Sequence, residues 1–279
     1  MKAVVRRKYG KPDIISVEER EVRSPGKDEV VVKVHVATVN RTDCANLTAK
    51  PFIMRFVLGL LKPRKIILGT DFAGTVFLRG DNVKVFEKGD NVFGFIDTGA
   101  ESHAEYVTVN KRDLFSMPEG INFKQAAASL EGAHYAYATI QKVNLQPGQS
   151  VLINGATGAI GSALLQFVKE YDVDLTATSD TKNMELIKSL GADVVIDYTK
   201  DDFTKAQEAY DFIFDTVGKI SFGECKPLLK DKGVYISSEL GRFAQNVFYP
   251  FLTLWANKKV IFPIPVSYTH LTLPTICSV

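Results

Sequence analysis

The chain contains little cysteine and histidine, and it has no long apolar run. Its 279 residues include 3 cysteines, at positions 44, 225 and 277. Three scattered cysteines make neither a disulfide framework nor a zinc cluster, which favours a reducing compartment. No stretch reaches the ~18 apolar residues of a membrane span, and the amino-terminal MKAVVRRKYGKPD lacks the apolar region of a signal peptide. We therefore expect a cytoplasmic protein without a membrane partner.

The sequence also lacks an excess of charge of either sign. Its 34 lysines and arginines and 32 acidic residues leave a net charge of +2, which gives no sign of nucleic-acid binding. A hydrophobic content of 46% and a charged content of 24% are ordinary for a soluble globular protein. The length suffices for a large core in one or two domains.

Two regions with different expected secondary structure follow one another along the chain, and the first, residues 1–122, has the pattern of a β-rich domain. The segment DEVVVKVHVATVN places Val30, Val32, Val34 and Val36 on one face of a strand. Further short strands are expected at KAVVRR, FAGTVF, GDNVFGFI and AEYVTV, separated by Gly, Asp and Asn turn signals.

From residue 123 to 265, expected strands alternate with expected helices. The strands are SVLIN, VDLTAT, DVVID, DFIFD, GVYISS and KVIFPI. Strand and helix in regular alternation predict a parallel, doubly wound sheet, so the chain is expected to combine a β-rich domain with an α/β domain.

The glycine-rich segment NGATGAIGSA, residues 154–163, lies between the first of these strands and an amphipathic helix. Such a turn points backbone N–H groups and a helix N-terminus at a pyrophosphate. Gly158 would let the phosphates approach, and Gly161 would let the helix pack closely on its strand. Because Ala156 replaces the first glycine of G-x-G-x-x-G, a plain tight turn is the alternative. The expected cofactor-binding residues are Gly155, Ala156, Thr157, Gly158, Ala159, Ile160 and Gly161.

The choice of dinucleotide is expected to depend on residues ~20 positions further on, in TATSDTKN. Hydroxyls of Thr178 and Ser179 and the cation of Lys182 suit the 2′-phosphate of NADP. Asp180 argues for NAD, because a carboxylate repels a phosphate. The alternative is a solvated turn in which Ser179 or Asp180 caps the next helix. We expect NADPH in preference to NADH.

With these segments in their order, the chain resembles the medium-chain dehydrogenase/reductase superfamily, in its zinc-free quinone oxidoreductase branch. The resemblance runs from Met1 to about Pro265 and includes VNRTD, GTDFAGTV, GDNVFGF, AAASLEGAHYAY, KSLGADVVIDY, FDTVG and GVYISSELG. It implies a GroES-like catalytic domain and a Rossmann NADP-binding domain, with cofactor and substrate meeting in the cleft between them. It also implies that Tyr198 lies near the adenosine and that Val217, Gly218, Ser237 and Ser238 lie along the nicotinamide.

The chain departs from zinc-dependent members of that superfamily at each expected ligand. Asn40 stands where they have a cysteine, and Thr70 and Asp71 stand where they have a His-Glu pair. Leu130 and Glu131 occupy the region of the third ligand, and the four-cysteine lobe is missing. Catalytic zinc needs three protein ligands, so we expect no metal.

Without a metal, hydride transfer to a quinone or a conjugated carbonyl is the favoured chemistry, because conjugation spreads the developing charge. A hydrogen-bond donor near the developing oxyanion is then needed. Asn40 is the first candidate, and a turn residue closing a strand is its alternative. His134 is expected to position the nicotinamide or donate a proton, unless it is a hydrogen-bonded histidine at a helix start. Asp43 is expected to orient the Asn40 loop.

Three functions remain open at this stage. The first is an NADPH-dependent reductase of quinones or conjugated carbonyls. The second is a zinc-free alcohol or aldehyde dehydrogenase, which needs a general acid that the sequence does not identify. The third is a non-catalytic NADPH-binding fragment. The resemblance further implies a homodimer in the full-length parent, paired through the last strand.

Two apolar stretches and the end of the chain complete the expectations. KPFIMRFVLGLLKP is read as a substrate lid or a short covering helix, and NVFYPFLTLWANKK as a core helix with Phe248, Leu252 and Trp255 on its apolar face. Residues 266–279, VSYTHLTLPTICSV, resemble translated sequencing-adapter read-through. They are expected to be a non-native tail on a truncated catalytic domain; the alternative is a natural tail that adds a β-segment.

Overall fold

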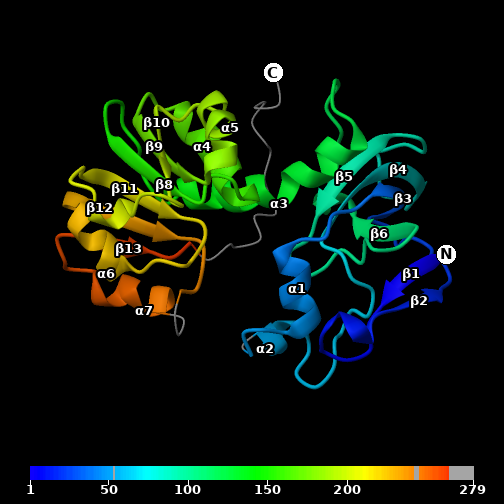
Figure 1. Ribbon diagram of the computed structural model, residues 1–279. Helices are drawn as coiled ribbons and strands as arrows, with labels where there is room; N and C mark the ends of the chain where they lie inside the picture. Colours follow the sequence, from blue (N-terminus) through cyan, green and yellow to red (C-terminus); the bar gives the residue numbers. More distant parts are fainter. Residues whose placement is uncertain (53, 242–244, 264–279) are drawn as a thin grey trace. The chain divides into compact units, whose positions relative to one another are not determined.

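The computed structural model describes residues 1–52, 54–241 and 245–263 of the chain. Contacts divide it into two units (Figure 1): unit 1 comprises Met1–Leu130, and unit 2 begins at Glu131. The division falls inside helix α3 (Phe123–Ile140), which begins where the sequence places the domain boundary. The expected non-native tail, residues 266–279, lies outside the described residues.

Unit 1 is built on a five-stranded antiparallel sheet in the order β6-β3-β4-β5-β7, with β1 and β2 paired as a separate two-stranded sheet. The strands are β1 (Lys2–Val5), β2 (Ser16–Glu19), β3 (Glu29–Val36), β4 (Asp71–Arg79), β5 (Asn91–Phe95), β6 (Tyr106–Asn110) and β7 (Leu114–Ser116); the helices are α1 (Arg41–Thr48) and α2 (Met54–Leu58). This is the β-rich, GroES-like half that the sequence predicts.

Alternation along β3 places Val30 and Val32 in the core of this sheet, where both are 0% exposed. Val31, on the opposite face, is also 0% exposed. The first half of β3 is therefore covered on both faces, whereas Lys33 and His35, further along the face of Val31, are exposed as the alternation predicts.

Unit 2 is a six-stranded parallel sheet in the order β10-β9-β8-β11-β12-β13. Its strands are β8 (Ser150–Asn154), β9 (Asp174–Ser179), β10 (Val194–Asp197), β11 (Tyr210–Asp215), β12 (Leu229–Ser237) and β13 (Lys259–Ile261); its helices after α3 are α4 (Ala159–Lys169), α5 (Met184–Ser189), α6 (Phe222–Cys225) and α7 (Gln245–Leu252). The order reverses beside β8, the position at which doubly wound sheets bind their ligands. The predicted Rossmann fold is confirmed.

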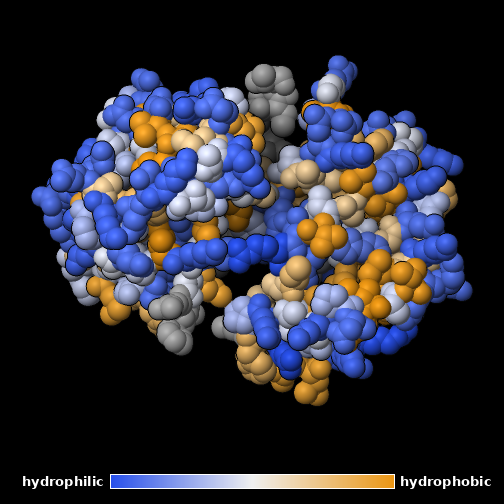
Figure 2. All heavy atoms as spheres, viewed as in Figure 1, coloured by the Kyte–Doolittle hydropathy of each residue, from blue (hydrophilic) through white to orange (hydrophobic). Residues whose placement is uncertain are grey.

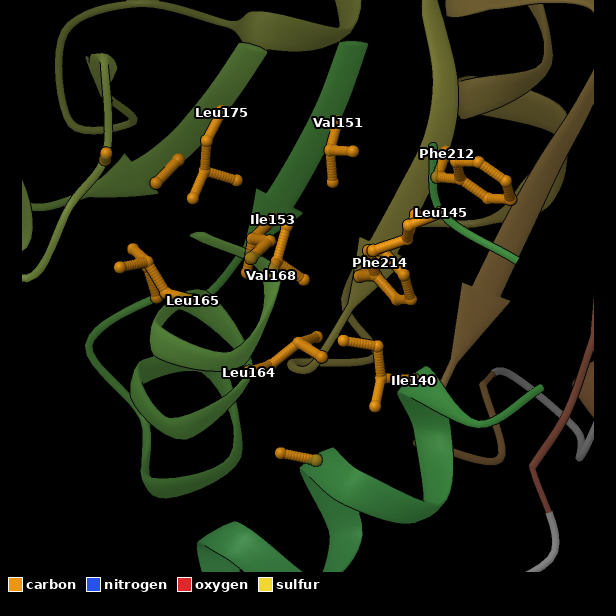
Figure 3. Close-up of a cluster of buried hydrophobic side chains, with 14 of the residues drawn as sticks. Ile140, Leu145, Val151, Ile153, Leu164, Leu165, Val168, Leu175, Phe212 and Phe214 are labelled. Atoms are coloured by element: carbon orange, nitrogen blue, oxygen red, sulfur yellow. The ribbon is translucent and has the colours of Figure 1, made fainter. Parts of the chain in front are cut away.

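The largest core cluster of unit 2 fixes β8 against α4 (Figure 3). Val151 and Ile153 of β8 and Leu164 and Val168 of α4 are all 0% exposed. Because both elements are held by this packing, the four residues that join them, 155–158, must form a tight turn at the carboxyl end of β8.

Helix α7 forms as predicted, but the predicted apolar face is wrong. Phe248, Leu252 and Trp255 are 62%, 74% and 94% exposed. The covered side carries Asn246, whose amide donates to the Glu239 carbonyl at 2.9 Å, and Thr253, whose hydroxyl accepts from the Val260 N–H at 3.0 Å. Thr253 follows the end of α7 at Leu252, and Tyr249 of the helix packs against the core, so polar anchors and one aromatic contact together set the orientation of this helix.

Apolar side chains are also exposed over the α2 region of unit 1 (Figure 2), where Phe52, Phe56 and Leu61 are 62%, 64% and 88% exposed. The stretch is a short helix with its neighbouring turns. Within the described part of the chain, no helix combines the length and the apolar character that crossing a bilayer requires.

Candidate functional site

Gly155 of the turn after β8 and Gly161 of α4 are both required by the packing of the chain itself. Gly155 has a φ of +89°, and a Cβ there would lie 2.2 Å from Val217 Cγ2. A Cβ on Gly161 would lie 2.2 Å from the Gly155 carbonyl oxygen. Both distances are far below van der Waals contact, so neither position accepts a side chain without distorting the turn.

Gly158 is different, because nothing in the fold requires a glycine there. Its φ is −76°, and a Cβ would meet only the Gly155 carbonyl oxygen, at 3.4 Å. It is the N-cap residue of α4, and it offers no side chain to the free N–H groups of the first turn. Thr157, Gly158 and Ala159 are exposed, whereas Ala156 is buried and Ile160 packs against the core. The turn thus presents backbone donors to open space, as an anion site does.

A buried carboxylate, Asp215 at the end of β11, joins this turn to its neighbours. It is 1% exposed and accepts from the Asn154 amide of β8 at 3.0 Å. It also accepts from the backbone N–H groups of Val217 and Gly218, both at 3.1 Å. From β12 the Tyr235 hydroxyl donates to it at 2.9 Å. Asp215 therefore fixes the carboxyl ends of three adjacent strands.

Asp215, Asn154 and Tyr235 were not among the residues predicted from the sequence. Asp215 stands in the quoted FDTVG, directly after a buried strand. A carboxylate at such a position is the one signal in the sequence that marks it, because a buried charge must be paired or hydrogen-bonded.

Thr178 extends the same network to β9. It is 0% exposed; its hydroxyl donates to Asn154 Oδ1 at 2.8 Å and accepts from the Gly155 N–H at 3.0 Å. Ser179 is also 0% exposed and donates to the Asp180 carbonyl at 3.0 Å. The hydroxyls of these two residues are thus used within the protein, and Thr178 holds the glycine turn.

Lys182 and Tyr198 remain open to a ligand beside β9 and β10. The Lys182 side chain is 81% exposed, with its ammonium 3.7 Å from Asp180 Oδ2. Tyr198 is 52% exposed, and its backbone N–H donates to the Ser179 carbonyl at 3.0 Å. The two segments are joined by Asp197, which accepts from the hydroxyls of Thr181 and Thr199. These hydrogen bonds hold the pKa of the Asp197 carboxyl below its usual range.

The loops after β11 and β12 lie against each other. A Cβ on Gly218, whose φ is +73°, would lie 2.5 Å from Glu239 Cβ. Ser237 is 0% exposed and donates to the Glu239 carbonyl at 3.1 Å. The Ser238 hydroxyl is buried without a hydrogen-bond partner. An unpaired polar atom of this kind marks a position for a bound group or water.

A hollow of about 340 Å³ adjoins Gly218 and is lined also by residues of α6 and the start of α7. Asp215 is paired with Ser237 in the sheet, so Val217 and Gly218, predicted to lie along a nicotinamide, follow their strand at the same edge of the sheet as Ser237 and Ser238. The sheet carries the glycine turn at the same edge, as the switch-point rule requires.

Asn40 of unit 1 stands at the start of α1, as its N-cap residue. Its amide nitrogen donates to Asp71 Oδ2 at 2.6 Å. Asp71 is 1% exposed and also accepts from the backbone N–H and the hydroxyl of Thr38, at 2.9 and 2.5 Å. The amide of Asn40 is therefore held with its nitrogen toward a carboxylate, which leaves its second N–H as a directed donor.

Asp43 closes the same turn, because its Oδ2 accepts from the Asn40 backbone N–H at 2.9 Å. Its Oδ1 is buried without a partner. Burial raises the pKa of the Asp43 carboxyl, and the nearby Asp71 charge adds to this, while the Asn40 hydrogen bond and His103 oppose it. Asp43 thus orients the loop of Asn40.

His134 lies well inside α3, not at a helix start. It is half-buried, and its ring lies 5.5 Å from that of Tyr135 in an edge-on contact. It belongs to unit 2, whereas Asn40 and Asp43 belong to unit 1.

Comparison with known proteins supports these two halves. The profile of the alcohol dehydrogenase GroES-like domain matches residues 26–146, and that of a zinc-binding dehydrogenase matches residues 190–269. The chain is 30% identical to a chloroplastic quinone-oxidoreductase homolog of Spinacia oleracea, over 91% of this chain and 79% of that protein. It is 31% identical to a chloroplastic NADPH-dependent alkenal/one oxidoreductase of Arabidopsis thaliana, over 87% of this chain and 61% of that protein.

Solved structures of quinone oxidoreductases have a fold similar to that of this chain. A quinone oxidoreductase from Coxiella burnetii superposes with a TM-score of 0.82 at 24% identity, covering 96% of this chain and 84% of that one. The chain spans between 58% and 63% of the length of four curated relatives, the Arabidopsis protein among them.

The name of the second profile implies zinc, but the residues present do not fit it. Both oxygens of Asp71 are already hydrogen-bonded, and Asn40 turns a donor nitrogen toward them. Within the described residues, no group of three or more His, Cys, Asp and Glu side chains is arranged to hold a metal ion. No chemistry is therefore assigned to zinc.

The raised pKa of Asp43 predicts how stability depends on pH. The folded state binds the Asp43 proton more tightly than the unfolded state, so this group's stabilising contribution is complete below the ordinary aspartate pKa. It is lost as pH rises through the raised pKa of the folded state. The test compares the free energies of unfolding of Asp43→Asn and the wild type in urea between pH 3 and pH 7. The wild type should lose stability relative to the variant as pH rises. Asp81→Asn, at an exposed position, controls for the lost charge; a difference that is constant with pH would contradict the burial argument.

Proposed function

We propose a function from the premise that this chain belongs to the medium-chain dehydrogenase/reductase superfamily, in its quinone oxidoreductase-like branch. The proposed activity is transfer of a hydride from NADPH to a quinone or a conjugated carbonyl, without a metal. The relatives named as a quinone-oxidoreductase homolog and as an alkenal/one oxidoreductase support this choice of acceptor.

The observation that carries the proposal is the open position at Gly158. The fold explains Gly155 and Gly161 by packing, whereas Gly158 has ordinary φ and an almost empty Cβ position. A glycine that the fold does not need, at an uncapped helix start, fits the close approach of a pyrophosphate. The unpaired Ser238 hydroxyl fits the nicotinamide end of the same cofactor.

Lys182 supports NADPH in preference to NADH. An exposed ammonium suits a 2′-phosphate, and Tyr198 is exposed on the adjoining segment. Asp180, which would repel a phosphate, accepts from the Asn183 amide at 2.6 Å and lies near Lys182, so part of its charge is offset.

The protein must position the substrate against the cofactor and supply one hydrogen-bond donor to the oxygen on which negative charge develops. Bound NADPH supplies the hydride. In a quinone or an enone, conjugation spreads the negative charge that develops, so a neutral donor suffices. We assign that donor to the second amide hydrogen of Asn40, which Asp71 holds in orientation. A simple aldehyde would place a full charge on one oxygen, which calls for a stronger electrophile or for an acid beside that oxygen.

The glycine turn gives the first of three tests of this proposed function. Gly158→Val should stay folded and weaken NADPH binding by about 100-fold or more, because its side chain would fill the phosphate's space. NADPH fluorescence titration measures the affinity, and circular dichroism measures folding. Gly223→Val is the matched control, since a Cβ there meets only Ser221 Oγ at 3.7 Å. Unchanged affinity in folded Gly158→Val would remove the basis of the proposal.

Cofactor preference gives the second test. Lys182→Ala should lower the affinity for NADPH about tenfold and leave the affinity for NADH nearly unchanged. Tenfold is at the low end of the effect of losing a charged hydrogen bond, because the Lys182 side chain is exposed. Lys205→Ala is the control, because Lys205 is also 81% exposed and pairs with an aspartate, Asp202. An equal loss for both cofactors would show that Lys182 meets no 2′-phosphate.

The chemical step gives the third. Asn40→Ala should lower turnover of a quinone and an enone by about 100-fold with NADPH affinity unchanged, since the lost donor acts on the developing oxyanion. Asn82→Ala, an exposed asparagine of the same unit, is the control. NADPH oxidation is followed with a quinone, an enone and an aldehyde, with and without chelator. Two outcomes would defeat the proposal: loss of activity with chelator that added zinc reverses, or turnover of the aldehyde alone.

A further inference from the structure

Two arginines of unit 1 lie over one aromatic ring. The guanidinium carbons of Arg6 and Arg55 are 5.2 and 5.0 Å from the centroid of the Tyr9 ring. Arg6 directly follows β1, and Arg55 belongs to α2 (Figure 1). The Tyr9 hydroxyl donates to the Gly59 carbonyl at 2.6 Å, which fixes the ring between these elements. The fold thus gathers two cations in one place.

Both guanidiniums stack on aromatic rings, since Arg55 also lies 5.4 Å from the centroid of the Phe52 ring, but neither is paired with a carboxylate in the part of the chain that the structure describes. Arg6 is 3% exposed and donates to the Asn46 backbone carbonyl, and none of the described salt bridges joins Arg6 or Arg55 to a carboxylate. The Nε atoms of both arginines are buried without an acceptor. Burial lowers the pKa of the Arg6 guanidinium. A buried cation is costly unless it is paired, so two cations sharing a ring favour an anion beside them.

Asn46 adds the opposite kind of unmet group. This α1 residue is 4% exposed, and its amide nitrogen donates to the Asp97 carbonyl at 3.3 Å. Its Oδ1 is buried without a donor. The cluster therefore leaves two donors, on Arg6 and Arg55, and one acceptor, on Asn46. A ligand that satisfies all three carries acceptor atoms for the arginines and one donor, such as a hydroxyl, for Asn46.

We propose that Arg6, Arg55 and Asn46 form a binding site over Tyr9 for a phosphate group that retains an acidic hydroxyl. Its oxygens accept from the two arginines, and its P–OH donates to Asn46 Oδ1. Inorganic phosphate has such a hydroxyl at neutral pH, whereas sulfate has the charge without the hydroxyl. The site belongs to unit 1, the glycine turn belongs to unit 2, and this proposal is independent of the proposed function.

The test is calorimetric titration of the full chain, without NADPH, with sodium phosphate and with sodium sulfate at pH 7 and fixed ionic strength. Phosphate should bind, and sulfate should bind about tenfold more weakly, the difference made by one hydrogen bond to a buried group. Equal binding of the two anions would overturn the assignment of Asn46. Absence of phosphate binding at millimolar concentration would overturn the site, and ordered water would then satisfy these atoms.

Variants separate this site from the glycine turn. Arg55→Met should lower the affinity for phosphate about tenfold or more and leave the affinity for NADPH unchanged. The test rests on Arg55 because it is only half-buried, whereas replacing the buried Arg6 endangers folding. Arg64→Met is the matched control, since Arg64 is an exposed arginine that donates to the Val57 carbonyl at 3.2 Å in the same region. Phosphate binding that survives Arg55→Met and disappears in Gly158→Val would belong to the turn and would refute the proposal.

A final pair of titrations at pH 5, with inorganic phosphate and with glycerol phosphate, distinguishes the two sources of this chemistry, because below the second pKa of a phosphate monoester, about 6, both ligands keep an acidic hydroxyl. Tighter binding of inorganic phosphate supports the free ion as the ligand. Tighter binding of the monoester, lost in Arg55→Met, supports a phosphorylated metabolite at the same residues.

Discussion

The site of unit 2 depends on one buried carboxylate. Removing an ionised carboxylate from water costs several kcal/mol, which hydrogen bonds must offset. Asp215 meets this cost with donors from Asn154, Tyr235 and the N–H groups of its own loop. Each donor belongs to a different strand end or loop, so satisfying the charge forces those segments into one arrangement. A chain of hydrogen bonds through Asn154 to Thr178 then carries the constraint to the glycine turn.

The glycines divide into those that serve this arrangement and one that does not. Gly155 and Gly161 let the turn contact Val217 and let α4 pack on the turn, which brings polar strand ends close enough to bond. Gly158 contributes nothing to that packing. A sequence motif treats these glycines alike, and only the space around each one separates folding from ligand approach. This distinction makes the glycine turn evidence about a ligand as well as about a fold.

The sequence predicted the elements well because their signals are local. Strand patterns such as SVLIN and DFIFD and the helix after the turn follow from period and composition over a few residues. The hydrogen bonds of the site join residues far apart in sequence, such as Asn154 to Asp215 across 61 positions and Asn40 to Asp71 across 31. The buried hydroxyl of Thr178 and the outward face of α7 have the same origin, because tertiary contacts decide which way a polar side chain turns.

The same reasoning explains why an asparagine suits the position of Asn40. A side chain at a helix N-cap ordinarily accepts from the first turn, and this alone would not aim its nitrogen. Asp71 aims it, because a buried carboxylate binds the amide nitrogen and excludes the flipped orientation. An aspartate at position 40 would face Asp71 as a second charge. A neutral donor locked by a satisfied carboxylate is weaker than a metal ion, and such a donor is adequate only where the substrate itself spreads the developing charge. If Asn40 has the role proposed above, the arrangement of unit 1 favours conjugated acceptors on physical grounds, separately from any likeness to known reductases.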